Sequence, residues 1–363
     1  GSNQQLLEVN NLVTEFSSDG KITKAVDGIS FVLNEGEILG IVGESGSGKS
    51  VTSLSIMQLI ASPPGKISGG TINFLNRDGQ MINLLSLKEN EVRKFRGNEI
   101  AMIFQEPMTS LNPVFTCGYQ VMESLQLHKG LNKAEARKQT LELFKKVKLP
   151  DAELKLDAYP HQLSGGQKQR VMIAMAMCCN PRLLIADEPT TALDVTVQST
   201  ILKLMHDLKK ESCMSMIFIT HDLGVIAEVA DKVAVMYKGK IVEQGTVEQI
   251  FSSPKHPYTK GLLACRPPLD KKLKRLPVVA DFMKAADHGE LEEISAPENA
   301  DWKISITEFE QQARLEKLQQ QKPILQIKNL STWFPKKKSW LEGSKDFIKA
   351  VDDVSFDVYP GET

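Results

Sequence analysis

The residues of this sequence best suited to chemistry form a glycine-rich stretch over residues 43–50. Its spacing fits G-x-x-x-x-G-K-[ST], the pattern of a loop that binds phosphate. The glycines let successive backbone N–H groups turn toward phosphate oxygens, and a helix that begins at the loop favours anions at its N-terminus. Lys49 can then reach the β- and γ-phosphates, and the Ser50 hydroxyl can hold Mg²⁺. The stretch therefore predicts a nucleotide site made by Gly43, Glu44, Ser45, Gly46, Ser47, Gly48, Lys49, Ser50 and Val51.

An acidic pair, Asp187 and Glu188, follows the apolar run 183–186. We expect this run to be a buried strand that delivers Asp187 beside the phosphate loop, where its carboxylate can orient Mg²⁺ together with Ser50. Glu188 is then placed to polarise an attacking water as the general base. Two acids after a strand can also simply cap a helix, but a phosphate loop in the same chain favours metal-assisted phosphoryl transfer.

A second Ser/Gly stretch ends twenty residues before Asp187 and consists of Ser164, Gly165, Gly166 and Gln167. It opens a predicted helix over residues 168–177, whose N-terminus can bind phosphate in the same way. Alone, the pattern equally suits a flexible turn. Together with the first loop it predicts ATP held between two protomers, because one chain rarely needs two cradles for the γ-phosphate of one site.

The hydrophobic pattern around these residues is that of an α/β protein. A small antiparallel sheet is predicted from residues 6–16, 25–33, 71–75 and 81–85, with a hairpin turn at 77–79. Apolar runs predict strands of a covered, mostly parallel sheet at residues 37–42, 100–104, 183–186 and 214–219. A helix is expected over residues 51–60, an inserted helical subdomain over 117–149, and a β hairpin at the sheet edge from 233–236 and 240–242.

The composition changes after residue 251 and becomes rich in proline and lysine. Residues 254–270 predict an irregular extension. Residues 301–322 predict a solvated, charged helix or linker that acts as a spacer, and we assign no chemistry to it.

An internal repeat links the two ends of the chain. Residues 324–334 match residues 6–16 at an offset of 318, and residues 350–362 match residues 25–37 at an offset of 325. The seven extra residues fall in the loop between the matched segments. Thr363 falls opposite Ile38, five residues short of where a second phosphate loop would start. We therefore expect the chain to be a piece of a longer protein with two similar nucleotide-binding halves.

The overall composition limits the remaining function classes. The 363 residues are 41% hydrophobic and 25% charged with a formal net charge of −1, so a global field gives no support to binding of nucleic acid or anionic membranes. The sequence has no apolar run of about 18 residues, so we do not expect a membrane-spanning helix. No N-terminal leader is evident, so we do not expect the protein to be exported. The five cysteines show no C-x-x-C spacing, which fits a reducing compartment.

Taken in chain order, these motifs resemble the ATP-binding cassette (ABC) transporter ATPases over residues 6–270. The resemblance is carried by the phosphate loop, Gln105, residues 163–167, Asp187 with Glu188, residues 192–194 and His221. Residues 105–113, 159–162 and 256–259 are most similar to the ATPases of oligopeptide and dipeptide importers. The resemblance implies an α/β P-loop NTPase cassette: a RecA-like core with a mostly parallel sheet, an antiparallel β subdomain and a helical subdomain that carries the signature sequence 163–167.

The resemblance also implies roles for residues outside the two loops. Phe16 would stack on adenine, and Gln105 would contact Mg²⁺ or the attacking water and sense the membrane partner. His221 would hydrogen-bond the γ-phosphate and Glu188, and Asp194 would couple the two sites of a cassette dimer. The expected catalytic set is then Lys49, Gln105, Glu188 and His221, and the expected Mg²⁺ set is Ser50, Gln105 and Asp187.

The implied organisation is an ABC domain over residues 3–250, an extension of the peptide-importer type over 251–300, a helical linker over 301–322 and the start of a second ABC domain over 323–363. The implied partners are a second cassette, in the same full-length chain or in a homodimer, integral membrane permease subunits and, indirectly, an extracytoplasmic solute-binding protein. The ATPase would be peripheral, on the cytoplasmic side of the bacterial inner membrane, and would drive import of peptides or a related small solute.

Two other classes of protein carry similar cassettes. Soluble tandem-cassette ATPases that act on ribosomes also have a charged helical linker, so residues 301–322 leave this alternative open. The extension after residue 251 and the stretch 105–113 favour the importer. DNA-repair cassette ATPases typically carry large insertions, often with zinc-binding cysteines, and neither feature occurs in the sequence.

Overall fold

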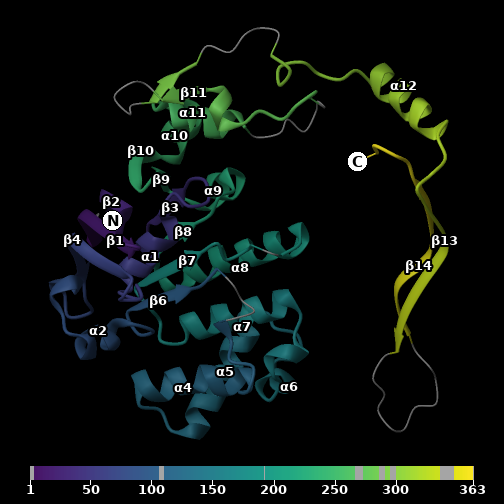
Figure 1. Ribbon diagram of the computed structural model, residues 1–363. Coiled ribbons are helices and arrows are strands. Elements are labelled where there is room, and N and C mark those ends of the chain that lie inside the picture. The colour runs from purple at the N-terminus through teal and green to yellow at the C-terminus, as the bar shows by residue number, and fades with distance from the viewer. Residues whose placement is uncertain are drawn as a thin grey trace, which may run out of the picture. The chain divides into compact units, whose positions relative to one another are not determined.

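The computed structural model describes residues 4–105, 110–191, 193–265, 273–285, 291–294, 300–335 and 347–362. The chain divides into two compact units, each drawn in Figure 1. The first unit comprises Gly1–Ala264 and Val278–Ile294, and the second comprises Cys265–Pro277 and Ser295–Thr363. Every residue predicted to bind nucleotide lies in the first unit.

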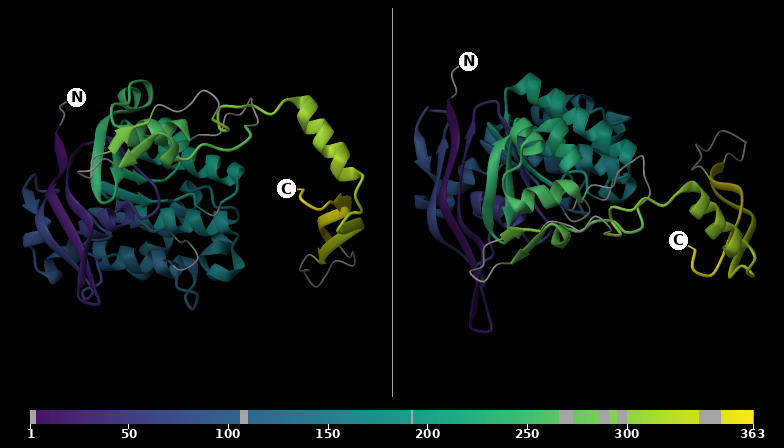
Figure 2. Two further views of the ribbon diagram at one scale, coloured as in Figure 1. Left: turned by 45° about the horizontal axis from the view of Figure 1, so that its top comes forward. Right: turned by 90° about the horizontal axis from the view of Figure 1, so that it is seen from above.

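The first unit begins with a four-stranded antiparallel sheet in the order β2-β1-β4-β5. Its strands are β1 (Gln5–Ser18), β2 (Lys21–Asn34), β4 (Gly65–Leu75) and β5 (Met81–Asn83). Asp19 and Gly20, between β1 and β2, have positive φ angles of 49° and 76°, as a tight two-residue hairpin requires. The tip of this hairpin extends beyond the other strands of the sheet (Figure 2). The predicted antiparallel sheet, including the β4–β5 hairpin, is confirmed.

A six-stranded sheet in the order β10-β9-β3-β8-β7-β6 forms the centre of the first unit. Five strands run parallel, and the edge strand β10 (Lys240–Thr246) is antiparallel to its neighbour. The parallel strands are β3 (Ile38–Val42), β6 (Ile100–Ile103), β7 (Leu183–Asp187), β8 (Ser215–Ile219) and β9 (Lys232–Tyr237). β3, β7 and β8 are buried at every residue, which explains their uninterrupted apolar runs. The predicted parallel core with an antiparallel edge is confirmed.

A separate helical region lies between β6 and β7 in the chain. The helices of that region are α4 (Cys117–Lys129), α5 (Lys133–Lys146), α6 (Ala152–Leu156) and α7 (Gly165–Met177). In Figure 1, α4, α5 and α6 lie at the end of the first unit away from β1 and β2. Gly130 ends α4 with a φ of 65°, and the Asn132 side chain caps α5, so the predicted helical stretch divides into two helices. The helical subdomain is confirmed.

Four further helices of the first unit lie next to individual strands in the chain order. α1 (Lys49–Ile56) follows β3, α8 (Val195–Ser212) follows β7, and α9 (Leu223–Val229) follows β8, while α2 (Glu89–Phe95) precedes β6. Short 3₁₀ turns occupy Leu84–Ser86 and Pro160–Gln162. Residues 51–60 were predicted to be helical, but α1 starts earlier, at Lys49, and ends at Ile56. The helix ends early because Gln58 has a φ of 50°, a left-handed conformation that does not continue a right-handed helix.

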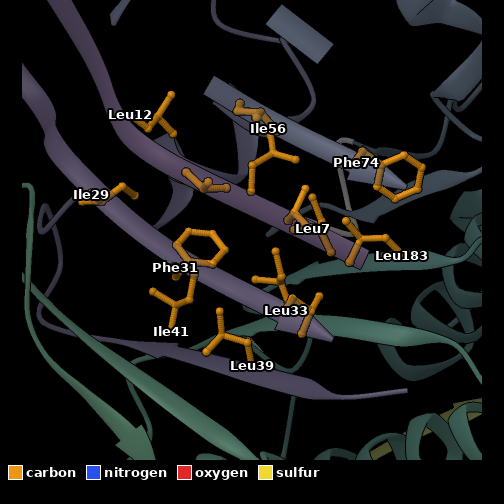
Figure 3. Close-up of a cluster of buried hydrophobic side chains, with 14 of the residues drawn as sticks. Leu7, Leu12, Ile29, Phe31, Leu33, Leu39, Ile41, Ile56, Phe74 and Leu183 are labelled. Atoms are coloured by element: carbon orange, nitrogen blue, oxygen red, sulfur yellow. The ribbon is translucent and has the colours of Figure 1, made fainter. Parts of the chain in front are cut away.

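The four-stranded and six-stranded sheets of the first unit share one hydrophobic core (Figure 3). Each of its central side chains is at most 4% exposed, and full burial of one such side chain contributes about 1.5–3 kcal/mol. Those labelled in the figure are Leu7, Leu12, Ile29, Phe31, Leu33, Leu39, Ile41, Ile56, Phe74 and Leu183. Because β3 contributes Leu39 and Ile41 to this core, the start of the phosphate loop is fixed by the packing of both sheets.

The segment after β10 is more regular than predicted. It forms α10 (Val247–Ser252) and α11 (Pro257–Ala264), followed by a 3₁₀ turn (Val279–Asp281) and the hairpin β11 (Met283–Ala285) and β12 (Leu291–Glu293). The prediction of irregular structure over 254–270 is therefore wrong at α11, and residues 266–270 lie outside the described part. Proline suits the first position of a helix, where its missing N–H is no loss. The Glu243 carboxylate also fixes the preceding turn by accepting from the N–H groups of Lys255 (2.8 Å) and His256 (3.0 Å).

In its described residues, the second unit contains one helix and one β hairpin. α12 (Glu308–Gln319) has no buried residue, which confirms a solvated helix inside the predicted 301–322 segment. β13 (Leu325–Pro335) and β14 (Phe347–Val358) pair in antiparallel fashion. Among the described helices of both units, none combines the length and apolar character that crossing a bilayer requires.

Candidate functional site

The phosphate loop connects the end of β3 at Val42 to the start of α1 at Lys49. Two of its glycines are required by close contacts with the backbone of neighbouring strands. A Cβ atom on Gly43 would lie 2.2 Å from the carbonyl oxygen of Met236, and one on Gly48 would lie 2.4 Å from that of Ala25. Both glycines also have positive φ angles, 157° and 101°. Larger residues at these positions would displace the loop from β2 and β9.

Inside this loop lie a buried cation and a buried hydroxyl. The Lys49 ammonium donates to the carbonyl oxygens of Gly43 (2.8 Å) and Glu44 (3.0 Å), and the residue is only 5% exposed. Burial lowers the pKa of Lys49, and the nearby Glu188 and Asp187 carboxylates oppose that shift. The Ser47 Oγ is buried and has no hydrogen-bond partner among the described residues. A narrow glycine cradle with a cation and an unpaired hydroxyl fits a phosphate group.

Ser50 and Asp187 meet as predicted. The Ser50 hydroxyl donates to Asp187 Oδ1 at 3.0 Å, and the Ser53 hydroxyl lies 3.5 Å from Oδ2. Asp187 is 3% exposed. Burial raises the pKa of its carboxyl and the negative charge of Glu188 raises it further, while the Ser50 hydrogen bond opposes the shift. Oxygen atoms of hydroxyl and carboxylate groups are ligands that Mg²⁺ prefers, so the Ser50–Asp187 pair fits the ion.

The raised pKa of Asp187 has a consequence for stability. A carboxyl whose pKa is higher in the folded than in the unfolded state costs stability once it ionises, and the cost vanishes below the ordinary value of 3.8. Without nucleotide or Mg²⁺, Asp187→Asn should therefore raise the unfolding temperature at neutral pH, and its advantage should shrink as the pH falls toward 4. Thermal scans across this pH range test it. A variant less stable than the wild type at neutral pH would contradict the sign of the shift.

The Glu188 carboxylate is the point at which three other side chains meet. Its Oε2 lies 3.3 Å from Gln105 Nε2, 2.8 Å from Thr191 Oγ1 and 3.4 Å from His221 Nδ1. Gln105, Glu188 and His221 follow β6, β7 and β8, which are adjacent in the sheet, so the carboxyl ends of these strands bring them together. The structure thus places the three predicted residues in contact. Thr191 was missed, and its one sequence signal is a hydroxyl three residues after the acid.

Glu188 has a φ of 47°, which is unusual for a residue with a side chain. Its backbone N–H donates to the Ile219 carbonyl oxygen at 2.8 Å, and Thr191 N–H donates back to the Glu188 carbonyl oxygen at 3.1 Å. These bonds hold the turn after β7. The carboxylate is consequently directed toward Gln105 and His221, where its side chain is 11% exposed.

The second Ser/Gly stretch packs on the start of α8. Ser164 Oγ accepts from the Gln167 N–H (3.3 Å) and Gln167 Oε1 accepts from the Ser164 N–H (3.2 Å), forming a capping box on α7. A Cβ atom on Gly166 would lie 2.8 Å from Val197, and the Asp194 carboxylate accepts from the Val197 N–H at 2.9 Å. Within the described part of the chain, no hydrogen bond joins residues 164–167 to the phosphate loop. Ala192, in the predicted 192–194 motif, lies outside that part.

Within the described residues, the other predicted site residues show no contact with the side chains around Glu188. Phe16 pairs with Thr23 of β2 and Gly65 of β4, and its ring lies 2.8 Å from where a Gly65 Cβ would be, so stacking on adenine stays a prediction. Val51 is half-buried on α1 beside Ser50. Ser45 and Gly46 are exposed at the tip of the phosphate loop. Residues 106–109 of the importer-like stretch lie outside the described residues.

Known proteins with similar sequences are ATP-binding transport proteins. The sequence model "ABC transporter" matches residues 26–191, and the model "Oligopeptide/dipeptide transporter, C-terminal region" matches residues 242–288. The chain is 47% identical to the glutathione import ATP-binding protein GsiA of Pectobacterium atrosepticum and 45% identical to that of Escherichia coli K12. Each match covers 99% of this chain and 55% of the relative, so the chain spans about half the length of these curated relatives.

Solved structures support the fold. The ATP-binding cassette MJ0796, in a dimeric post-hydrolysis state with ADP and Pi, is 29% identical with a TM-score of 0.59, over 67% of this chain and 99% of that one. CbiO1 of Clostridium perfringens, part of an ABC transporter complex, is 29% identical with a TM-score of 0.57, over 69% of this chain and 92% of that one. The fold is thus that of an ABC ATPase cassette of the α/β P-loop class. The chain is therefore similar to the ABC transporter family over residues 26–191 and to the C-terminal region of the oligopeptide/dipeptide transporters over residues 242–288.

Proposed function

We propose that this chain is the ATP-binding and ATP-hydrolysing motor part of an ABC importer. The observation that carries the proposal is the convergence of Lys49, the Ser50–Asp187 pair and Glu188 with its contacts at the carboxyl ends of adjacent strands. Lys49 would bind the β- and γ-phosphates of ATP, and Ser50, Asp187 and Gln105 would hold Mg²⁺. Bound Mg²⁺ would neutralise charge on the phosphate oxygens.

Glu188 would act as the general base for the water that attacks the γ-phosphate. Its Oε2 is already in contact with Gln105 and His221. These two side chains can hold the carboxylate in place and help to position the attacking water. His221 would also hydrogen-bond the γ-phosphate. Thr191 joins this group as an additional residue that orients the carboxylate.

We also propose that the ATP site is completed by the signature sequence of a second cassette. Residues 164–167 pack on α8, and no described hydrogen bond ties them to the phosphate loop of the same chain. Asp194, at the start of α8, would then lie between the two sites and couple them. The structural relative MJ0796 was itself solved as a dimer with ADP and Pi.

The second cassette is proposed to begin within this chain. β13 pairs Leu325 with Val358 and Leu330 with Val354. Subtracting 318 from the β13 residue numbers and 325 from the β14 residue numbers gives the pairs Leu7–Leu33 and Leu12–Ile29. Both are pairs that β1 and β2 form. Local details repeat as well: Asn11 and Asn329 have φ angles of 47° and 50°, and each donates its N–H to a serine hydroxyl, at 2.9 Å and 2.8 Å. Two hairpins with the same register and irregularities support one ancestral fold used twice.

The β13–β14 hairpin lacks the packing that stabilises its counterpart. Leu330, Val354 and Phe356 are 45%, 39% and 50% exposed, whereas Leu12, Ile29 and Phe31 at the equivalent positions are at most 4% exposed. A two-stranded hairpin is marginal in water. In hydrogen-exchange measurements on this chain, amides of β13 and β14 should exchange at least about 100-fold faster than their equivalents in β1 and β2. We therefore propose that residues 323–363 do not form a stable domain on their own, and equal protection of the two hairpins would contradict this.

The solute and the partners are inferred from the relatives. GsiA is named as a glutathione import protein, and residues 242–288 match a region of peptide transporters, so we propose a peptide-type solute. Permease subunits in the bacterial inner membrane would bind the cassette on its cytoplasmic side, and an extracytoplasmic binding protein would deliver the solute.

Co-purification tests this proposal against the ribosomal alternative. The chain, expressed with an affinity tag in its source cells, should retain integral membrane permease subunits and sediment with the membrane fraction. The comparisons give the ribosomal alternative no support. Retention of ribosomes without permease would nevertheless revive it, and retention of neither would remove the transport proposal.

A further inference from the structure

Tyr258 lies in α11, outside the residues that match the ABC transporter family and inside those that match the importer C-terminal region. Its side chain is 0% exposed. The ring packs on that of Tyr237 at the end of β9, with centroids 4.5 Å apart and planes inclined by 40°. A buried tyrosine hydroxyl needs polar partners, and the phosphate loop supplies one of them.

The Tyr258 hydroxyl accepts a hydrogen bond from the backbone N–H of Glu44, with the two atoms 2.9 Å apart. This N–H and the carbonyl group of Gly43 belong to the same planar peptide unit and point in opposite directions. The Gly43 carbonyl oxygen accepts from the Lys49 ammonium at 2.8 Å. One peptide of the phosphate loop is therefore held between Tyr258 on one side and Lys49 on the other, so any rotation of that peptide would disturb both bonds.

The start of α11 is itself anchored to the central sheet. Glu243 of β10 accepts from the N–H groups of Lys255 and His256, and His256 Nδ1 accepts from the Tyr258 N–H at 3.1 Å. β10 pairs with β9, which ends at the Tyr237 ring against which Tyr258 packs. A continuous series of contacts thus links β10, α11 and the backbone of Glu44.

The β9–β10 hairpin braces the same loop. Gly239 N–H, in the turn between these strands, donates to the Ser47 carbonyl oxygen at 2.9 Å. The carbonyl oxygen of Met236 is the atom that a Cβ on Gly43 would meet. The first and fifth residues of the loop therefore rest on this hairpin, and the second residue rests on Tyr258.

We propose that Tyr258 is a positioning residue of the nucleotide site, through which the C-terminal segment sets the conformation of the phosphate loop. The inference rests on the proposed function, because it assigns Tyr258 a role in the affinity of that loop for Mg-ATP. It makes the segment after residue 242 a working part of the nucleotide site. Tyr258 acts through the Gly43–Glu44 peptide and does not itself touch the phosphates.

The test is Tyr258→Phe in the whole chain, which keeps the ring on Tyr237 and removes only the hydroxyl. The dissociation constant of a fluorescent ATP analogue with Mg²⁺ should rise about 3- to 10-fold, the worth of one hydrogen bond. Without nucleotide, the Glu44 amide should exchange faster, while the amides of α11 keep their protection. Tyr119→Phe is the matched control, because Tyr119 is an exposed residue of α4 whose ring stacks on Phe115. Its affinity should equal that of the wild type.

Unchanged affinity together with unchanged Glu44 exchange would overturn the proposal. So would general loss of protection throughout α11, because the hydroxyl would then serve only the packing of the helix. Should Tyr258→Phe fail to fold, exchange in the unaltered chain decides: the Glu44 amide must be slower than those of Ser45 and Gly46. If the wild type and Tyr119→Phe both fail to bind Mg-ATP, the proposed function fails, whereas the Glu44 exchange still reports on Tyr258.

Discussion

Replacing Glu188 by glutamine is expected to lower the rate of ATP hydrolysis by about 10²- to 10⁴-fold while leaving Mg-ATP binding intact. Glutamine has nearly the same size and can still accept from Thr191 through its amide oxygen, so the turn after β7 should keep its shape. It cannot take a proton from water. The loss should therefore appear in the turnover number at saturating Mg-ATP, measured as phosphate release, and the dissociation constant should stay within about threefold.

Glu123→Gln provides the control for this prediction. Glu123 is an exposed residue of α4, so the same chemical change there should leave phosphate release at the wild-type rate. Unchanged hydrolysis by Glu188→Gln would refute the general-base role. A rise in the dissociation constant with unchanged turnover would instead make Glu188 a binding residue, and the contacts with Gln105 and His221 would need another explanation.

The central part of the site was predictable because its residues are tied to strand ends. The apolar run before Asp187 and the one before His221 indicated buried strands, and parallel strands present their carboxyl ends at one edge of a sheet. From that rule, Asp187 and Glu188 were expected beside the phosphate loop, whereas the expected contact of His221 with Glu188 came from the resemblance to ABC ATPases. The Ser50–Asp187 and His221–Glu188 contacts agree with these expectations. The β13–β14 hairpin was predictable for a different reason, since its residues repeat those of β1 and β2.

What the sequence did not predict depends on contacts that residue types do not indicate. Tyr258 bonds to a backbone N–H that is 214 residues away, and every residue except proline has such a group. Thr191 is one of several hydroxyls near Glu188, and only the turn geometry selects it. α11 was missed because prolines around it were interpreted as irregular structure, although Pro257 occupies a position where a helix tolerates proline.

Replacing Lys49 by alanine should abolish Mg-ATP binding, with an increase of about 100-fold or more in the dissociation constant. Each hydrogen bond between charged groups contributes about 1.5–3 kcal/mol, and Lys49 would make one to the β-phosphate and one to the γ-phosphate. Since each 1.4 kcal/mol is a factor of ten, loss of both bonds exceeds a change of about 100-fold. The variant should differ from Glu188→Gln, which is expected to bind and not to turn over. Lys203→Ala is the control, because Lys203 is exposed on α8. Binding by Lys49→Ala within about threefold of the wild type would remove Lys49 from the site.

The pH dependence of binding gives an independent test of the same residue. Burial lowers the pKa of Lys49 in the nucleotide-free chain, and the negative charge of bound phosphates would favour the ammonium form and raise that pKa again. Binding should therefore take up a proton once the pH exceeds the lowered value. Affinity should fall as the pH rises past the lowered pKa of Lys49 toward 10.5, the ordinary value for lysine. Lys49→Ala lacks the ammonium group, so its residual affinity should not fall with pH in this way. A binding affinity of the wild type that does not change with pH would mean that Lys49 does not contact the phosphates.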